Sequence, residues 1–236
     1  MIFDCDGVLV DSEWLSCATL ADVLTAAGAP ATPDECARDF TGGTVEMIRA
    51  VTERRTGRPL PGAFEETYAR ALFDRFRRDL RAFEGVTALL DALDRAGVPY
   101  CVASNGTRDR LGASLGATGL LPRFDGRIFS GVEVARPKPA PDVFLHAAET
   151  LRADPARCLV VEDTPTGIAA GRAAGMTVWA PATTFDPGRL ATADAVFPSV
   201  ASLGDALLAG LGRDRTGRGY AASGTDVRPA DRSSTQ

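Results

Sequence analysis

Short apolar runs that end in polar or glycine-containing turns recur along the chain. The runs are IFDCDG near the start, VPYCVASNG at 98–106, RIFSG at 127–131, RCLVVEDT at 157–164 and MTVWA at 176–180. Continuous apolar runs of this kind are typical of strands that are buried on both faces of a parallel sheet. Segments with helical periodicity separate them, at 86–97, 108–119, 141–151 and 166–175. The alternation of strand and helix predicts an α/β fold with a doubly wound parallel sheet.

One long segment interrupts this alternation. From Glu13 to about Arg81 the chain has no convincing strand pattern, and helix-like stretches occupy 13–27, 33–40, 44–56 and 63–80. The simplest interpretation is an all-helical cap domain inserted after the first strand. It would lie over the carboxyl ends of the strands, where open α/β sheets bind ligands. We therefore predict a core domain of residues 1–12 and 82–211 and a cap domain of residues 13–81.

The two ends of the chain depart from this pattern. Only three residues, Met1 to Phe3, precede Asp4, whereas strands of about five residues are usual. Either the first strand is unusually short or the native start lies upstream. Residues 212–236 are rich in Gly, Ser, Thr, Arg and Asp and nearly lack aliphatic side chains. Burial cannot offset the ordering entropy of such a segment, so it is predicted to be disordered.

Composition narrows the classes of function. With 26 Lys and Arg against 31 Asp and Glu, the net charge of -5 gives no global positive field for nucleic acid or an anionic membrane. No apolar stretch approaches the roughly 18–20 residues that span a bilayer, and no signal-peptide pattern opens the chain. The five cysteines are widely spaced without a C-x-x-C pattern, which favours reduced core thiols. We therefore expect a cytoplasmic protein, and a monomer because no extra apolar stripe indicates an interface.

Polar side chains follow four of the predicted strands. They are Asp4 and Asp6 after the first, Ser104 and Asn105 after the second, Lys138 in the loop beyond the third, and Glu162 and Asp163 after the fourth. The carboxyl ends of parallel strands share one edge of the sheet. We therefore expect these side chains to converge on one pocket.

The types of side chain in this set predict a reaction. Carboxylates are hard oxygen ligands suited to Mg²⁺, while Lys138 and the Ser104 hydroxyl can bind phosphate oxygens. A carboxylate can attack phosphorus to give an aspartyl-phosphate, and a second acid two residues along the extended backbone can protonate the leaving oxygen. Mg²⁺ and the lysine would neutralise charge on the transferring phosphoryl group. The set favours metal-assisted phosphoryl transfer.

Four segments in this order carry a resemblance to a known family: DCDGVLVDSE, SNG, RPKPAPD and VVEDTPTGIAAGRAAGM. They resemble the motifs of the haloacid dehalogenase superfamily, in the branch with a helical cap inserted after the first motif. The resemblance covers about residues 1–210 and implies a Rossmann-like core.

The resemblance also implies a role for each motif residue. Asp4 would be the nucleophile and a metal ligand, and Asp6 the general acid and base whose backbone carbonyl binds Mg²⁺. Asp163 would bind the metal directly and Glu162 through water. The phosphate would be held by Ser104, Asn105 and Lys138.

The segment DFTGGTVEM at 39–47 is a glycine-containing turn between two predicted cap helices. Its glycines can serve the turn alone. In capped relatives the corresponding turn faces the active site and helps to choose the substrate. Thr41, Gly42 and Gly43 are therefore candidate specificity residues.

The preferred interpretation is a Mg²⁺-dependent phosphatase for a small phosphorylated metabolite, such as a sugar phosphate or a related monoester. The alternative is a phosphomutase of the β-phosphoglucomutase type, although such enzymes carry a histidine where this chain has Ser16, and lysine and arginine near Thr41. A dehalogenase needs neither Asp6 nor a metal ligand such as Asp163. A phospho-accepting signalling domain lacks the helical insertion, and a non-catalytic binding protein has no need of the full set of catalytic residue types.

Overall fold

The fold is that of a computed structural model, which describes residues 1–41 and 43–213. Gly42 and residues 214–236 lie outside the described residues, and most of the tail that was predicted to be disordered falls there. The first two residues of that tail, at 212 and 213, end the last helix, α9 (Val200–Arg213).

Six parallel strands form one sheet within the described residues, in the order β3-β2-β1-β4-β5-β6. Their bounds are β1 Ile2–Phe3, β2 Cys101–Ser104, β3 Ile128–Ser130, β4 Leu159–Val161, β5 Thr177–Pro181 and β6 Ala195–Phe197. The first strand has only two residues, yet it pairs on both sides, with Ile2 opposite Cys101 and Val160. The next backbone N–H, of Asp4, donates to the Val161 carbonyl at 2.9 Å. The predicted doubly wound parallel sheet is confirmed.

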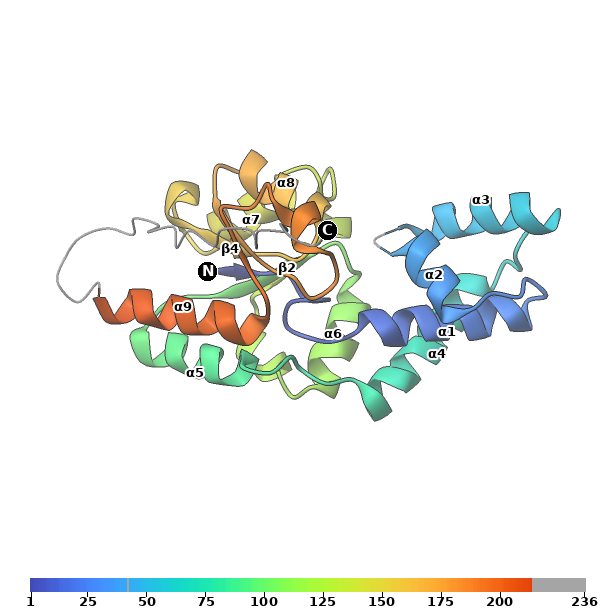
Figure 1. The fold of residues 1–236 in the computed structure, drawn as a ribbon, viewed down its shortest axis with the longest axis horizontal. Coiled ribbons are helices and arrows are strands. Elements are labelled where there is room, and N and C mark those ends of the chain that lie inside the picture. The colour runs from blue at the N-terminus through green and yellow to red at the C-terminus, as the bar shows by residue number, and fades with distance from the viewer. Residues whose placement is uncertain (42, 214–236) are drawn as a thin grey trace, which may run out of the picture.

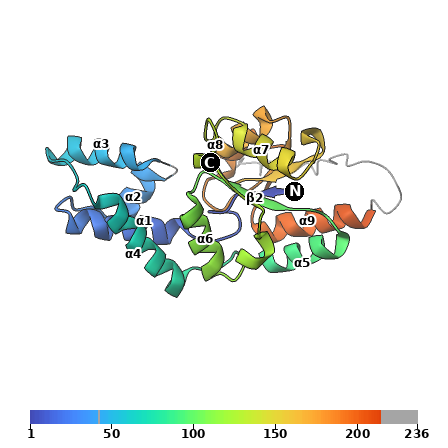
Figure 2. The same cartoon turned by 180° about the vertical axis from the view of Figure 1, so that it is seen from behind.

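Helices cover both faces of this sheet (Figures 1 and 2). On one face lie α5 (Val86–Ala96), α6 (Arg108–Ala117) and α9, and on the other lie α7 (Asp142–Thr150) and α8 (Pro165–Ala173). Alternate residues of the central strands feed the two faces. Phe3 and Val161 pack with the first group of helices, whereas Ile2 and Val160 pack with the second. This two-sided burial explains why the strands read as continuous apolar runs.

Four helices between β1 and α5 form a separate layer at the end of the molecule where α6 lies (Figures 1 and 2). They are α1 (Glu13–Ala26), α2 (Pro33–Phe40), α3 (Val45–Thr56) and α4 (Phe64–Asp79). A hydrophobic cluster of their own holds them together, with Leu24, Cys36 and Phe64 among its buried members. Local signals set their ends: Thr32 and Glu35 form a capping box on α2. These four helices are called the cap below.

The chain enters and leaves the cap through two segments that lie side by side. Val10 and Ala82 form an antiparallel bridge. The Asp11 N–H donates to the Arg81 carbonyl at 3.0 Å, and the Phe83 N–H donates to the Leu9 carbonyl at 3.1 Å. The two linkers are thus hydrogen-bonded to each other.

Strand β6 and helix α9 go beyond the elements predicted from the sequence. β6 is a three-residue edge strand paired with β5. On α9, the apolar side chains of Val200, Leu203 and Leu207 are buried with α5 and the sheet. Their spacing of three and four residues is the helical signal that identifies α9 in retrospect.

The described part of the chain contains no helix that is long and apolar enough to cross a membrane. All five cysteines are free and buried, which confirms the prediction of unpaired core thiols. The thiol of Cys5, between the two aspartates, lies 3.5 Å from the Ser114 hydroxyl oxygen. Burial raises the pKa of its thiol well above the usual value, so it is a packing residue.

Candidate active site

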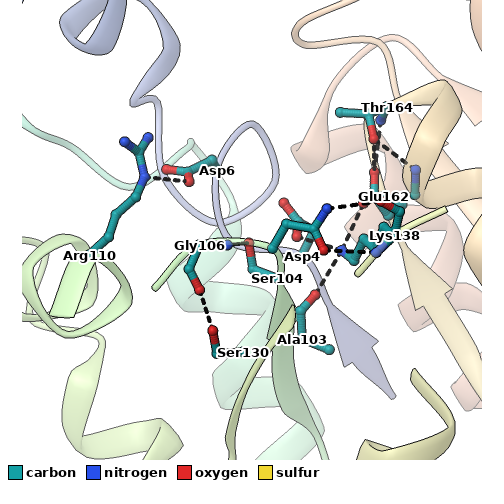
Figure 3. A network of polar contacts seen from close by, with 12 residues as sticks. Asp4, Asp6, Ala103, Ser104, Gly106, Arg110, Ser130, Lys138, Glu162 and Thr164 are labelled. Atoms are coloured by element: carbon teal, nitrogen blue, oxygen red, sulfur yellow. Dashed lines mark hydrogen bonds and ion pairs between the residues drawn. The ribbon is translucent and has the colours of Figure 1, made fainter. Parts of the chain in front are cut away.

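Side chains from three separate segments meet at the carboxyl edge of the sheet (Figure 3). The Lys138 ammonium donates to Asp4 Oδ1 at 2.7 Å, to Glu162 Oε1 at 2.9 Å and to the Ala103 carbonyl at 2.8 Å. Asp4 follows β1, Glu162 follows β4 and Lys138 lies in the loop beyond β3. All three side chains are buried. The structure thus joins one ammonium to two carboxylates that lie far apart in the sequence.

The loop that carries Lys138 is held by Asn105, at the end of β2. Asn105 Oδ1 accepts from the Lys138 N–H at 2.9 Å, and its Nδ2 donates to the Lys138 carbonyl at 3.2 Å. The ammonium also lies 4.6 Å from the centre of the Phe144 ring. Because the side chain of Asn105 is committed to the lysine loop, the phosphate contact expected of this residue would fall to its backbone N–H.

Ser104 ends β2 and is buried. Its hydroxyl oxygen accepts from the Gly106 N–H at 3.4 Å, and the Gly106 carbonyl accepts from the Ser130 hydroxyl at 2.6 Å. These bonds shape the SNG turn beside the lysine loop (Figure 3).

Burial and the neighbouring charges shift the pKa values of Asp4 and Lys138. Burial disfavours the ionised form of Asp4 and raises its pKa to about 7, with Glu162 adding to the rise and Lys138 opposing it. Burial also opposes charge on Lys138, but Asp4 and Glu162 outweigh it, and the pKa of the ammonium is raised. The lysine is therefore held as a cation between the two carboxylates.

Glu162 has both of its oxygens occupied. While Oε1 accepts from Lys138, Oε2 accepts from the Thr164 N–H at 2.8 Å and from the Thr164 hydroxyl at 2.9 Å. Thr164 is also the N-cap of α8, since its hydroxyl accepts from the Gly167 N–H at 3.0 Å. In this arrangement Glu162 orients the lysine, and its water-mediated support of a metal stays a prediction.

Asp163 carries a buried carboxylate oxygen, Oδ1, that has no hydrogen-bond partner among the described residues. Burial, followed by the nearby charges of Glu162 and Asp4, raises its pKa well above the usual value. An orphaned buried carboxylate oxygen is costly, and a bound cation would both supply the missing partner and reverse the shift. Asp163 and Asp4 therefore fit the two direct carboxylate positions of a metal site.

The rest of a metal shell would come from other oxygens. Across the two described ranges, no group of three or more His, Cys, Asp or Glu side chains is arranged as a complete metal centre. A hard cation such as Mg²⁺ usually takes only one or two carboxylates and completes its shell with water and phosphate oxygens. The donor set agrees with that mode of binding.

Gly7 lets the loop after β1 approach Asp163 closely. It has φ +77°, and a Cβ built at this position would lie 2.0 Å from Asp163 Oδ2 and 2.7 Å from the Thr184 hydroxyl oxygen. We expect Gly7→Ala to lower the free energy of unfolding by about 3 kcal/mol, from the left-handed backbone and the overpacking together. Urea unfolding monitored by circular dichroism measures this loss.

Gly28→Ala is the matched control for that variant. Gly28 has nearly the same φ, +79°, but a Cβ there meets nothing within 4 Å. We expect it to lose only about 1–2 kcal/mol, from the backbone alone. Equal losses in the two variants would show that the close approach of Gly7 to Asp163 does not constrain the loop.

Asp6 points away from the lysine cluster and toward Arg110 (Figure 3). Its Oδ2 accepts from Arg110 Nε at 3.0 Å, and its Oδ1 accepts from the Ser12 hydroxyl at 2.5 Å. Burial alone would raise the pKa of Asp6, but the guanidinium and the Ser12 hydroxyl outweigh it and lower the pKa. Arg110 was not among the residues predicted from the sequence. The available signal is its place in the first turn of the helix that follows the SNG motif, because this turn lies at the same edge of the sheet.

No described hydrogen bond joins Thr41 or Gly43, two of the candidate specificity residues, to the lysine cluster. Thr41 follows α2 and lies near the carboxyl group of Glu13, whose pKa is raised by burial and held back by Thr41. Gly43 donates its N–H to the Phe40 carbonyl at 2.9 Å, which is a turn contact. Gly42 lies outside the described residues. A role of this turn in substrate choice stays a prediction.

The fold and the site together define a class of protein. A doubly wound sheet binds ligands at its carboxyl edge, and the aspartate, lysine and glutamate in contact there can act on a group that carries negative charge, such as a phosphoryl group. Residues 1–175 match the family of haloacid dehalogenase-like hydrolases.

Individual relatives agree with this match. The chain is 33% identical over 180 residues to the 6-phosphogluconate phosphatase of Escherichia coli (strain K12), covering 76% of this chain and 80% of that protein. It is 30% identical over 194 residues to the validoxylamine A 7'-phosphate phosphatase of Streptomyces hygroscopicus subsp. limoneus, covering 82% and 90%. A crystal structure of a HAD family hydrolase from Deinococcus radiodurans R1, with bound phosphate and sodium, superposes with a TM-score of 0.73 at 35% identity, covering 89% and 95%. The chain therefore belongs to the haloacid dehalogenase-like hydrolase family and is a phosphoric monoester hydrolase.

Proposed function

We propose that this chain is a Mg²⁺-dependent phosphatase that hydrolyses a small phosphorylated metabolite through an aspartyl-phosphate formed on Asp4. The observation that carries the proposal is the buried contact of Lys138 with Asp4 and Glu162, next to the orphaned carboxylate of Asp163. It brings together a carboxylate that could attack phosphorus, a fixed cation and a buried carboxylate oxygen without a described hydrogen-bond partner, all at one edge of the sheet. The core of residues 1–12 and 82–211 would supply this chemistry and the cap of residues 13–81 would cover it.

The metal would be held by the carboxylates of Asp4 and Asp163 and by the backbone carbonyl of Asp6, with Glu162 supporting it through water. When bound, Mg²⁺ neutralises charge on the phosphoryl group and orients its oxygens. On the other side, Lys138, the Ser104 hydroxyl and the Asn105 backbone N–H would hold the phosphate oxygens.

Hydrolysis would then proceed in two steps on the chain's own side chains. In the first, an Asp4 oxygen bonds to phosphorus while the bond from phosphorus to the leaving oxygen breaks. The protonated form of Asp6, which the contact with Arg110 disfavours, gives its proton to the departing alcohol. In the second, Asp6 removes a proton from a water molecule that attacks the same phosphorus. Inorganic phosphate leaves and the Asp4 carboxylate is restored.

A sugar phosphate or a related monoester is the proposed substrate. The E. coli relative is named for 6-phosphogluconate, a phosphorylated sugar acid, and another E. coli relative, 37% identical over 122 residues, is named hexitol phosphatase A. Specificity would reside in the cap, where Thr41, Gly42 and Gly43 are the candidates. The core groups recognise only phosphate and metal.

Phosphate release from a panel of phosphorylated sugars, sugar acids, polyols and nucleotides tests the proposal, with Mg²⁺ or with EDTA. We expect release from one group of substrates, a loss of at least about 100-fold in kcat when EDTA removes the metal, and recovery with excess Mg²⁺. Release that is insensitive to EDTA would exclude the metal. Isomerisation of β-glucose 1-phosphate without release would favour the phosphomutase alternative, and silence on every substrate would overturn the proposal.

A further inference from the structure

Arg110 joins the loop of Asp6 to the cap. In the first turn of α6, its Nε donates to Asp6 Oδ2 at 3.0 Å and its Nη2 donates to the Ser16 hydroxyl oxygen of α1 at 3.1 Å. Its guanidinium carbon lies 5.5 Å from the centre of the Phe76 ring of α4. One side chain thus contacts the loop after β1 and two different cap helices.

The contact between Arg110 and Asp6 is partly buried and has a defined geometry. The side chains of Arg110 and Asp6 are only 22% and 21% exposed, so their attraction is less screened than that of a surface pair. The guanidinium is a planar fork with fixed donor directions, and Asp6 and Ser16 occupy two of them. By contrast Arg108, in the same helical turn, is largely exposed and pairs with Glu133 at the surface.

We propose that Arg110 is a positioning residue that sets the direction of the Asp6 carboxylate and ties this direction to the cap. The inference rests on the proposed acid and base role of Asp6. A general acid must lie within hydrogen-bond reach of the leaving oxygen, and a misplacement of about 1 Å can cost about 100-fold in rate. Because Ser16 and Phe76 belong to the cap, a shift of the cap against the core would move the guanidinium and, with it, the acid.

The test is the dependence of kcat/KM on the leaving group. This parameter reports the steps up to aspartyl-phosphate formation, in which Asp6 protonates the alcohol. p-Nitrophenolate is a stable anion and leaves without receiving a proton. The alkoxide of an alkyl phosphate is strongly basic and needs a proton from a general acid as it leaves. We expect Arg110→Gln to lower kcat/KM by about 10-fold to 100-fold for an alkyl phosphate, and by less than about 3-fold for p-nitrophenyl phosphate. Equal losses for the two esters would overturn the proposal.

Circular dichroism shows whether Arg110→Gln folds. If it does not, two milder variants provide the same test. Arg110→Lys retains the charge beside Asp6 but lacks the fork that joins Asp6 to Ser16, so only part of the alkyl phosphate activity should return. Ser16→Ala removes only the cap end of the contact, and a smaller loss confined to the alkyl ester is expected. Arg108→Gln is the matched control and should change neither ester. Ester-independent losses in both milder variants would contradict the proposal.

A double-mutant cycle separates this inference from the function on which it rests. If Arg110 acts through Asp6, adding Arg110→Gln to Asp6→Asn should cause no further loss for the alkyl ester, whereas independent roles would give additive losses. If Asp6→Asn itself slows both esters equally, the acid role of Asp6 is wrong. If Asp6→Asn slows mainly the alkyl ester but Arg110→Gln slows both esters equally, only the positioning role of Arg110 is wrong.

Discussion

Replacing Asp4 with asparagine should lower kcat by about 10⁴-fold or more, because an amide oxygen does not attack phosphorus. The other groups of the site only assist this attack and cannot replace it. Asparagine has nearly the same shape, and its Oδ1 can still accept from the Lys138 ammonium, which also keeps its bonds to Glu162 and to the Ala103 carbonyl. Binding of inorganic phosphate should therefore change little. Steady-state phosphate release and calorimetric titration with phosphate measure the two quantities.

Stability is the control for Asp4→Asn. Because burial raises the pKa of Asp4 from 3.8 to about 7, the ionised side chain costs stability that builds up as the pH rises through this interval. Asparagine does not ionise. In EDTA above pH 7, the variant should thus be at least as stable as the wild type toward urea. A folded Asp4→Asn protein with near-normal turnover would rule out Asp4 as the nucleophile.

Replacing Lys138 with methionine should lower kcat/KM by about 10²-fold to 10³-fold, the usual effect of removing one fixed group that stabilises charge in the transition state. Methionine preserves much of the volume of the stem but leaves Asp4 and Glu162 without their shared cation. Phosphate affinity should fall together with the rate, which distinguishes this variant from Asp4→Asn. Phosphate release and calorimetric titration again provide the readouts.

The free energy of unfolding of the Lys138→Met variant is also expected to be about 3–5 kcal/mol lower, because the variant leaves two buried carboxylates without their cation. Arg136→Met is the matched control, since Arg136 lies in the same loop but is exposed and pairs with Asp142 at the surface. It should retain both activity and stability. An unchanged kcat/KM in a folded Lys138→Met protein would remove the lysine from the proposed mechanism.

The sheet and the meeting of distant side chains were predictable because each depends on a strong local signal. Buried parallel strands read as apolar runs, and the carboxyl ends of such strands share an edge. These two facts place Asp4, Lys138 and Glu162 near one another without any knowledge of their contacts. The four helices between β1 and α5 were predicted from a different signal, namely helix-like stretches in a long segment without a strand pattern.

Other features depend on geometry that periodicity does not contain. Whether Asn105 turns its amide toward phosphate or toward the Lys138 backbone depends on how the loops after β2 and β3 approach each other. Arg110 is one of several charged residues in TRDRL, and its contact with Asp6 depends on how α6 lies beside the loop after β1. Strand β6 is three residues long and lies at the edge of the sheet, so its pattern is too short to stand out.

The hydrogen-bonded linkers at Val10 and Ala82 have a mechanical consequence. Two independent linkers would let the cap move separately at each of its two attachment points. Linkers that are hydrogen-bonded to each other act as one hinge. Any rotation of the cap would then take place about this hinge, which keeps the cap next to the same edge of the sheet. Cap residues can therefore change while the side chains on the strand ends, Asp4, Lys138 and Glu162, keep their alignment.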